Sequence, residues 1–148
     1  MVEHLNRQRV LNFLELFCAG DIEGALSRCS DDIELIAPAP IEILPHMGPH
    51  RGKDEVRKTW QIIHGRYSRL RHEVREIVAE DDKVGASLRA FFEKRGSGRI
   101  VQFDIAVFYT LRDGRIVQIR EIIDTFDLVQ QVLERDIGAL LTGRPEGA

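Results

Sequence analysis

Residues 103–124 read FDIAVFYTLRDGRIVQIREIID, with a bulky apolar residue at every second position on both sides of Arg112-Asp113-Gly114. A period of two is typical of strands with one buried face, and Asp-Gly is among the strongest short hairpin signals. The residues that share this face are Phe103, Ile105, Val107, Tyr109 and Leu111 before the turn, and Val117, Ile119, Glu121 and Ile123 after it. The stretch therefore predicts two long antiparallel strands.

The same period continues upstream and predicts two more strands. One face of the first carries Leu70, His72, Val74 and Val78, and one face of the second carries Val84, Ala86, Leu88, Ala90 and Phe92. The second strand ends at the turn sequence KRGSG, residues 94–98. Four hairpin-connected strands are expected between residues 70 and 123.

The N-terminal part has helical spacing instead. Apolar residues recur every three or four positions in residues 5–17, and a short second helix follows with Asp21 as its N-cap. Residues 33–37 alternate as a strand, and a third helix is expected over residues 52–66 with Trp60 on its apolar stripe. A last helix begins at Asp124 or Thr125 and carries Phe126, Val129, Leu133, Ile137 and Leu140. Residues 142–148 are expected to be a frayed tail.

Residues 38–51 contain four of the five prolines of the chain. Proline lacks an amide donor and has a fixed φ, so we expect a loop there, of the kind that often covers a binding site. Helices grouped first and hairpin-connected strands afterwards indicate an α+β fold with a curved antiparallel sheet. The core is expected over residues 5–133 of a single domain, 1–148.

Composition narrows the function classes. A net charge of −3 over 148 residues argues against nucleic-acid binding, which needs a concentrated basic surface. Neither a signal peptide nor an apolar run long enough for a membrane span is read, so a cytoplasmic protein with no membrane partner is expected. Cys18 and Cys29 match no zinc or redox spacing, and His46 and His50 lie in a proline-rich loop rather than on a helix. We expect no metal site and no cofactor.

The string FYTLRDGRIV, residues 108–117, followed by REIID, residues 120–124, resembles the SnoaL-like branch of the nuclear-transport-factor-two-like superfamily. The resemblance extends over residues 5–133. It implies a cone-shaped α+β barrel whose curved sheet wraps a pocket roofed by helices, and a homodimer formed through the outer sheet face. Members include ketosteroid isomerases, the polyketide cyclase SnoaL, limonene epoxide hydrolases, dehydratases and binding proteins without catalysis, so the fold does not decide the function.

The resemblance also implies which catalytic sets are missing. Ala37 lies where a ketosteroid isomerase has its base, and Phe13 and Val107 lie where that family has its oxyanion donors. Leu88 and Ala90 replace the Arg-x-Asp pair of the limonene epoxide hydrolases, whose water-positioning residues correspond to Leu35 and Ala37. The acid on the last strand has a counterpart, which is Glu121.

Glu121 is the one charged residue on the face of its strand, and apolar surroundings raise the pKa of a carboxyl group. A raised pKa suits an acid or base near neutral pH; the alternative is a carboxylate paired with an arginine at the sheet edge. His72 is expected to point into the same interior and to form a proton-transfer pair with Glu121, or else to be a hydrogen-bonded core residue. Tyr109 is expected to donate its hydroxyl to a ligand, or to fill the core.

The expected ligand is a small hydrophobic molecule. The predicted substrate-binding wall comprises Leu35, Ala37, Trp60, Leu88, Ala90, Phe103, Ile105, Val107 and Ile119, with Met47 at the wall or entrance. The leading hypothesis is cofactor-free acid–base chemistry (isomerase, cyclase or dehydratase type) with Glu121 as acid or base. The alternatives are a non-catalytic ligand-binding protein and, third, an epoxide hydrolase with a rebuilt site.

Overall fold

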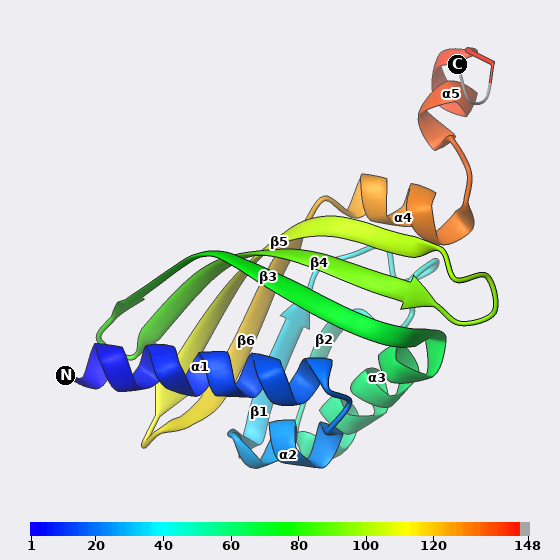
Figure 1. Cartoon of the computed structure of the whole chain (residues 1–148). Helices are drawn as coiled ribbons and strands as arrows, with labels where there is room; N and C mark the ends of the chain where they lie inside the picture. Colours follow the sequence, from blue (N-terminus) through cyan, green and yellow to red (C-terminus); the bar gives the residue numbers. More distant parts are fainter. Residues whose placement is uncertain (146–148) are drawn as a thin grey trace.

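The computed structural model describes residues 1–145 and consists of a curved six-stranded sheet with helices over its concave face (Figure 1). Two helices lead the chain, α1 (Val2–Cys18) and α2 (Ile22–Ser27), and α3 (Lys53–Arg66) follows the first two strands. The strands are β1 (Cys29–Ala37), β2 (Gly48–Arg51), β3 (Tyr67–Glu80), β4 (Lys83–Lys94), β5 (Ile100–Arg112) and β6 (Arg115–Ile123). The chain continues with α4 (Thr125–Leu133) and α5 (Ile137–Thr142).

The predicted α+β architecture is confirmed, with one correction to the sheet. The strand order is β2-β1-β6-β5-β4-β3, and every neighbouring pair is antiparallel except β1 and β6, which run parallel. The sheet is therefore mixed and open rather than wholly antiparallel. The parallel pair places Leu35 beside Ile119, so the first and last strands of the chain are neighbours within the sheet.

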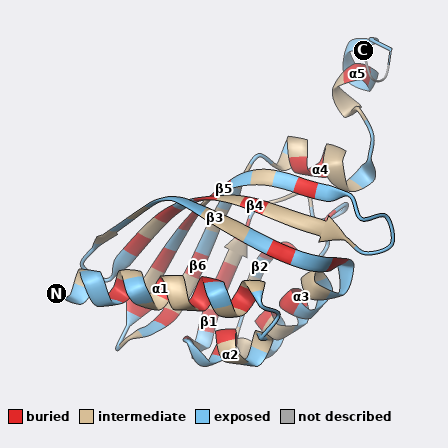
Figure 2. Ribbon diagram, in the orientation of Figure 1, coloured by how far each residue is buried: buried red, intermediate tan, exposed pale blue. Residues whose placement is uncertain are grey.

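The hairpin between β5 and β6 forms where Asp113-Gly114 predicts it. Both residues have positive φ, 53° and 77°, as a two-residue turn with the twist of the flanking strands requires. Along β5, buried inner residues alternate with more exposed outer residues, a pattern visible along the strands in Figure 2. Short-range turn chemistry specifies the turn, but the register slips beside it, because Thr110 pairs with Gln118 and Leu111 with Ile116. Ile116 is therefore buried there in place of the predicted Val117.

The predicted face of β3 is wrong in its second half. The register slips between Val74 and Glu76, where a β-bulge adds one residue to β3. A one-residue slip exchanges the two faces of a strand. Beyond the bulge Ile77 and Ala79 therefore pack against the core, while Val78 is 66% exposed.

Two other segments differ from prediction. Residues 48–51, expected as loop, form the edge strand β2, in which Pro49 is tolerated because an edge strand has one unpaired side. The expected single C-terminal helix is interrupted after Leu133, because Glu134 adopts a left-handed conformation with φ 55°. Asp124 caps α4 and Asp136 caps α5, each by accepting a backbone amide hydrogen bond. Of the predicted tail, Thr142 is the last residue of α5, residues 143–145 follow outside any helix or strand, and residues 146–148 lie outside the described residues.

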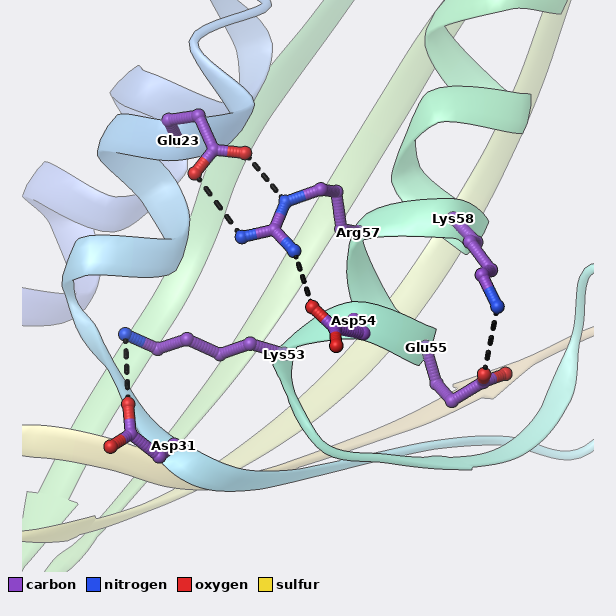
Figure 3. A network of polar contacts seen from close by, with 7 residues as sticks. All are labelled: Glu23, Asp31, Lys53, Asp54, Glu55, Arg57 and Lys58. Carbon is purple, nitrogen blue, oxygen red and sulfur yellow. Dashed lines mark hydrogen bonds and ion pairs between the residues drawn. The ribbon is translucent and has the colours of Figure 1, made fainter.

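Ion pairs join the N-terminal elements to α3 (Figure 3). Arg57 of α3 donates to Glu23 of α2 at 2.6 Å and to Asp54 at 2.7 Å, and Lys53 lies 3.4 Å from Asp31 in β1. Glu23, Asp31 and Asp54 are largely exposed, so each pair adds little stability. The pairs Arg57–Glu23 and Lys53–Asp31 connect α3 to α2 and to β1, whereas Arg57–Asp54 lies within α3.

Candidate functional site

A mostly apolar cavity of about 100 Å³ lies between the concave face of the sheet and the helices. Phe13 and Phe17 reach it from α1, and Trp60 reaches it from α3. Their rings pack together, with Phe13 and Phe17 at 5.6 and 5.5 Å from Trp60 between ring centroids. An apolar cavity of about 150 Å³ holds a benzene ring, so a ligand of that size needs the side chains of this smaller cavity to move slightly.

Glu121 lines this cavity from near the C-terminal end of β6. The sheet register pairs it with Val107 of β5, and its same-face neighbours along β6 are Ile119 and Ile123. Burial raises the pKa of Glu121 from 4.5 to about 7, because the charged form has lost its water and gained no compensating partner. Its carboxyl group makes no hydrogen bond or ion pair within residues 1–145. A carboxyl group in this state is able to give or take a proton at neutral pH.

Tyr109 is the polar neighbour of Glu121. It is buried on β5, one same-face step from Val107, and it also lines the cavity. Burial raises the pKa of its phenol well above 10, and the charge of Glu121 adds to this effect. Its hydroxyl has no hydrogen-bond partner in the described chain, so it is a neutral donor without a protein acceptor.

His72 lines the cavity from β3 but forms no pair with Glu121. It is opposite Ala90 of β4, which is opposite Phe103 of β5, whereas Glu121 is opposite Val107, four residues further along that strand. Burial alone lowers the pKa of His72 to about 4, with no contribution from the carboxylate. The predicted proton-transfer pair is therefore not formed in this structure.

The contact of His72 is Cys18, whose Sγ lies 3.3 Å from Nδ1 of the ring. Burial raises the pKa of the Cys18 thiol to about 11. Phe17 stacks on the imidazole with ring centroids 6.2 Å apart and planes 4° apart. A neutral imidazole and a protonated thiol are thus held together at the cavity wall.

Most of the predicted apolar wall surrounds the cavity. Eight residues of it are in place, namely Leu35, Ala37, Trp60, Leu88, Phe103, Ile105, Val107 and Ile119. Ala90 is the exception, because it is fully buried between His72 and Phe103 in the sheet and does not reach the cavity. Met47 lines the wall as expected.

The sequence pattern does not assign His46, Thr59 and Tyr67 to this cavity, which all three line. Nδ1 of His46 is buried and has no hydrogen-bond partner in the described chain. Burial, with smaller contributions from the charges of Arg66 and His50, lowers the pKa of His46 to about 4. The proline-rich segment could have indicated His46, because a loop that is expected to cover a binding site is also expected to supply residues to it.

No group of three or more His, Cys, Asp or Glu side chains within residues 1–145 is placed to hold a metal ion. None of the helices described has the length and apolarity to cross a membrane. Burial shifts the pKa of five side chains in the cavity wall, namely Glu121, Tyr109, Tyr67, His72 and His46.

The chain belongs to the SnoaL-like family, because the model of the SnoaL-like domain matches residues 10–119. A candidate isomerase from Rhodopseudomonas palustris is similar in structure, with a TM-score of 0.79, 25% identity, and 91% of this chain and 100% of that chain covered. An NTF2-like protein from Burkholderia xenovorans LB400 has a TM-score of 0.71 at 27% identity, covering 86% and 95%.

An LEH-like epoxide hydrolase from M. tuberculosis has a TM-score of 0.74 at 18% identity and covers 97% of this chain and 99% of its own. At that identity the likeness extends to the fold alone. No curated protein sequence matches the chain significantly. The family and its fold are thereby established, while the chemistry depends on the residues of the cavity.

Proposed function

We propose that this protein performs cofactor-free acid–base chemistry on a small hydrophobic molecule, with Glu121 as the acid or base. The observation that carries the proposal is a single carboxyl group in an apolar cavity with a pKa of about 7. A group of this pKa is present in both protonation states at neutral pH, which suits proton abstraction and return in an isomerisation, cyclisation or dehydration.

Tyr109 supports the proposal as a donor beside the carboxyl group. Its phenol stays protonated at all ordinary pH values, because burial and the charge of Glu121 both oppose ionisation. Its unpartnered hydroxyl is available to an oxygen on which negative charge develops as Glu121 removes a proton. The apolar wall strengthens this hydrogen bond, since little water competes for it.

Hydrogen exchange tests the proposal without knowledge of the natural substrate. A panel of small ketones is first screened for binding by thermal shift, because a ligand of the native state raises the melting temperature. Bound ketones are then followed by NMR in D₂O for exchange of the hydrogens next to the carbonyl group. The wild type should accelerate exchange, and the isosteric variant Glu121→Gln should reduce the rate to background.

Arg120→Gln is the matched control, because Arg120 is the exposed neighbour of Glu121 on the opposite face of β6. It should bind and exchange as the wild type does. Equal exchange rates in the wild type and Glu121→Gln would overturn the assignment of Glu121.

A non-catalytic ligand-binding protein is the second candidate. It is favoured by the separation of His72 from Glu121, since no second titrating group assists the carboxyl group through a hydrogen bond within residues 1–145. In the same experiment, ketones that bind and raise the melting temperature but exchange no faster than in buffer decide for this candidate.

We also propose that the protein is a cytoplasmic homodimer formed through the outer face of the sheet. Phe108 and Ile122 are each 49% exposed on that face. Ala106 lies on the same face of β5 as Phe108 and pairs with Ile122 of β6. Apolar side chains grouped on an exposed sheet face are typical of protein interfaces.

A further inference from the structure

The contact between Cys18 and His72 has no part in the chemistry assigned to Glu121. Cys18 is the last residue of α1, and His72 lies in β3 beneath it. Phe17 stacks on one side of the imidazole, and Phe92 packs at 5.8 Å between centroids with its plane tilted by 45°. The ring is thereby held in one orientation, with Nδ1 at 3.3 Å from Sγ of Cys18.

The protons on this pair follow from their surroundings. Burial keeps the pKa of the thiol at about 11 and that of the imidazole at about 4, so both groups are neutral near pH 7. A neutral imidazole has one donor and one acceptor nitrogen, and a thiol is a weak donor whose sulfur is also a weak acceptor. The imidazole nitrogen is the better acceptor of the two. Cys18 therefore donates to Nδ1, and the ring proton resides on Nε2.

Nε2 of His72 has no hydrogen-bond partner among residues 1–145, and the ring forms part of the cavity wall. Nε2 is not fully enclosed by protein, so a ligand in the cavity can reach it. An acceptor on the ligand would take this hydrogen bond, whereas a pure hydrocarbon would displace water from the donor and leave it without a partner. The geometry therefore favours a ligand with an oxygen near His72.

We infer that Cys18 is a positioning residue that fixes His72 as a neutral donor through Nε2, and that the cavity selects a small apolar molecule carrying a carbonyl oxygen. The inference rests on the proposed function in one respect, since it assigns a substrate class to the same cavity. It adds a polar anchor on β3, set apart from Tyr109 on β5 and Glu121 on β6. In a carbonyl compound, the hydrogens on the carbon next to the carbonyl group are also acidic enough for a carboxylate base to remove.

Nitrogen-15 NMR of the histidine side chains at pH 7 tests the positioning role directly, and the spectrum of His72→Gln identifies the signals of His72. In the wild type, Nδ1 should have the shift of an unprotonated nitrogen and Nε2 that of a protonated one. Cys18→Ala removes the donor and should populate the other tautomer, while Cys18→Ser supplies a hydroxyl donor and should restore the wild-type pattern. A protonated Nδ1 in the wild type, or an unchanged pattern in Cys18→Ala, overturns the role of Cys18.

A matched pair of probes tests the ligand class. Cyclohexanone and methylenecyclohexane have the same ring and differ in an exocyclic oxygen or CH₂ group. The wild type should bind the ketone about fivefold more tightly, as expected for one net hydrogen bond between neutral groups. His72→Phe should abolish this preference, Cys18→Ala should weaken it, and Cys18→Ser should retain it.

The outcomes separate this inference from the proposed function. Equal binding of the two probes by the wild type, or a preference that persists in His72→Phe, overturns the inference. A preference that persists in His72→Phe and disappears in Tyr109→Phe would assign the donor to the phenol of Tyr109 instead. Neither the NMR spectra nor the ratio of the two binding affinities requires turnover. Both measurements therefore test the inference even if the protein does not catalyse hydrogen exchange.

Discussion

Tyr109 and Glu121 are diagonal neighbours on the inner face of the β5–β6 hairpin. The register pairs Val107 with Glu121 and Tyr109 with Ile119, so the phenol and the carboxyl group are offset by one same-face step on adjacent strands. Diagonal side chains are within reach of one another when one is aromatic. The charge of Glu121 contributes to the raised pKa of Tyr109, so the two groups are electrostatically linked. This pair is the polar centre of an otherwise apolar part of the wall.

Replacing Glu121 with Gln should stabilise the protein at neutral pH but not in acid. The carboxyl group has a pKa of about 7 in the folded state and about 4.5 when unfolded. Below pH 4.5 both states are protonated, and between 4.5 and 7 only the unfolded state ionises, so the stability of the wild type falls as pH rises. At about 1.4 kcal/mol per pKa unit, the full difference is about 3 kcal/mol. Urea denaturation at pH 4 and pH 8 measures it.

The control for this experiment is Arg120→Gln, which changes one charge on the opposite face of the same strand. Its stability relative to the wild type should have no comparable pH dependence. If Glu121→Gln and the wild type keep a constant difference in free energy of unfolding from pH 4 to pH 8, the pKa of Glu121 is not raised.

Tyr109→Phe should leave stability nearly unchanged, within about 1 kcal/mol, because the hydroxyl that it removes has no hydrogen-bond partner in the described chain. The ring, in contrast, packs at 6.0 Å from Phe13 in an edge-on arrangement. Tyr109→Ala should therefore cost about 3–5 kcal/mol, as large aromatic deletions in cores do. Urea denaturation of both variants checks this, and a large loss in Tyr109→Phe would reveal a hydrogen bond of the hydroxyl.

The two strands that meet at Asp113-Gly114 could be predicted because their signals are local. Alternation defines the inner face, so the sequence alone places Tyr109 and Glu121 on a common wall. The bulge between Val74 and Glu76 could not be predicted from the sequence of β3 alone. Its position is decided by the pairing of β3 with β4. The same holds for the parallel pairing of β1 with β6, which joins distant parts of the chain.

The candidate site was predictable to the extent that it lies on regular strands. The sequence predicts correctly that His72 lies on the inner face. Its distance from Glu121 could not be predicted, because it depends on how many strands separate the two residues and on the register of each strand. His46 was missed because its position depends on the path of an irregular loop, which has no period to read. Glu134 interrupts the last helix without a glycine, and a left-handed non-glycine residue carries no clear sequence signal.

Ala37→Leu should abolish binding of small probes while the fold is retained. Ala37 ends β1 at the cavity wall, and three added carbons would fill part of a volume of only about 100 Å³. Added atoms find empty space here, so the overpacking that usually costs about 1–3 kcal/mol should be reduced. The loss of the thermal shift with cyclohexanone, at an unchanged far-ultraviolet circular dichroism spectrum, is the expected result. Undiminished probe binding would show that ligands occupy another site.

His46→Leu should make the protein less sensitive to acid. The pKa of His46 is about 4 in the folded state and about 6.5 when unfolded. Between these values the unfolded state takes up a proton and the folded state does not, so the wild type loses stability as pH falls from 6.5 to 4. The loss should be clearly less than the ~3 kcal/mol of a fully enclosed ring, because solvent screens the partly exposed His46. His72 contributes in the same direction, so the variant removes only part of the loss. Urea denaturation at pH 7 and pH 4.5 measures the difference, and His4→Gln, at an exposed histidine of α1, is the control.

Phe108→Glu should prevent dimer formation through the outer face of the sheet. Phe108 is about half exposed and packs beside Gly85, where the absence of a side chain leaves the ring uncovered. A carboxylate at this position would be buried without a partner in a symmetric interface, and a two-fold axis brings both copies close together, so repulsion adds to the loss of water. Light scattering should give a monomer mass for the variant and twice that mass for the wild type. Thr110→Glu, further along the same strand on the same face, should be less disruptive because Thr110 pairs with the polar Gln118 and Lys83. A wild type that is monomeric at all concentrations would refute the interface, and a dimer that persists in Phe108→Glu would assign it to another surface.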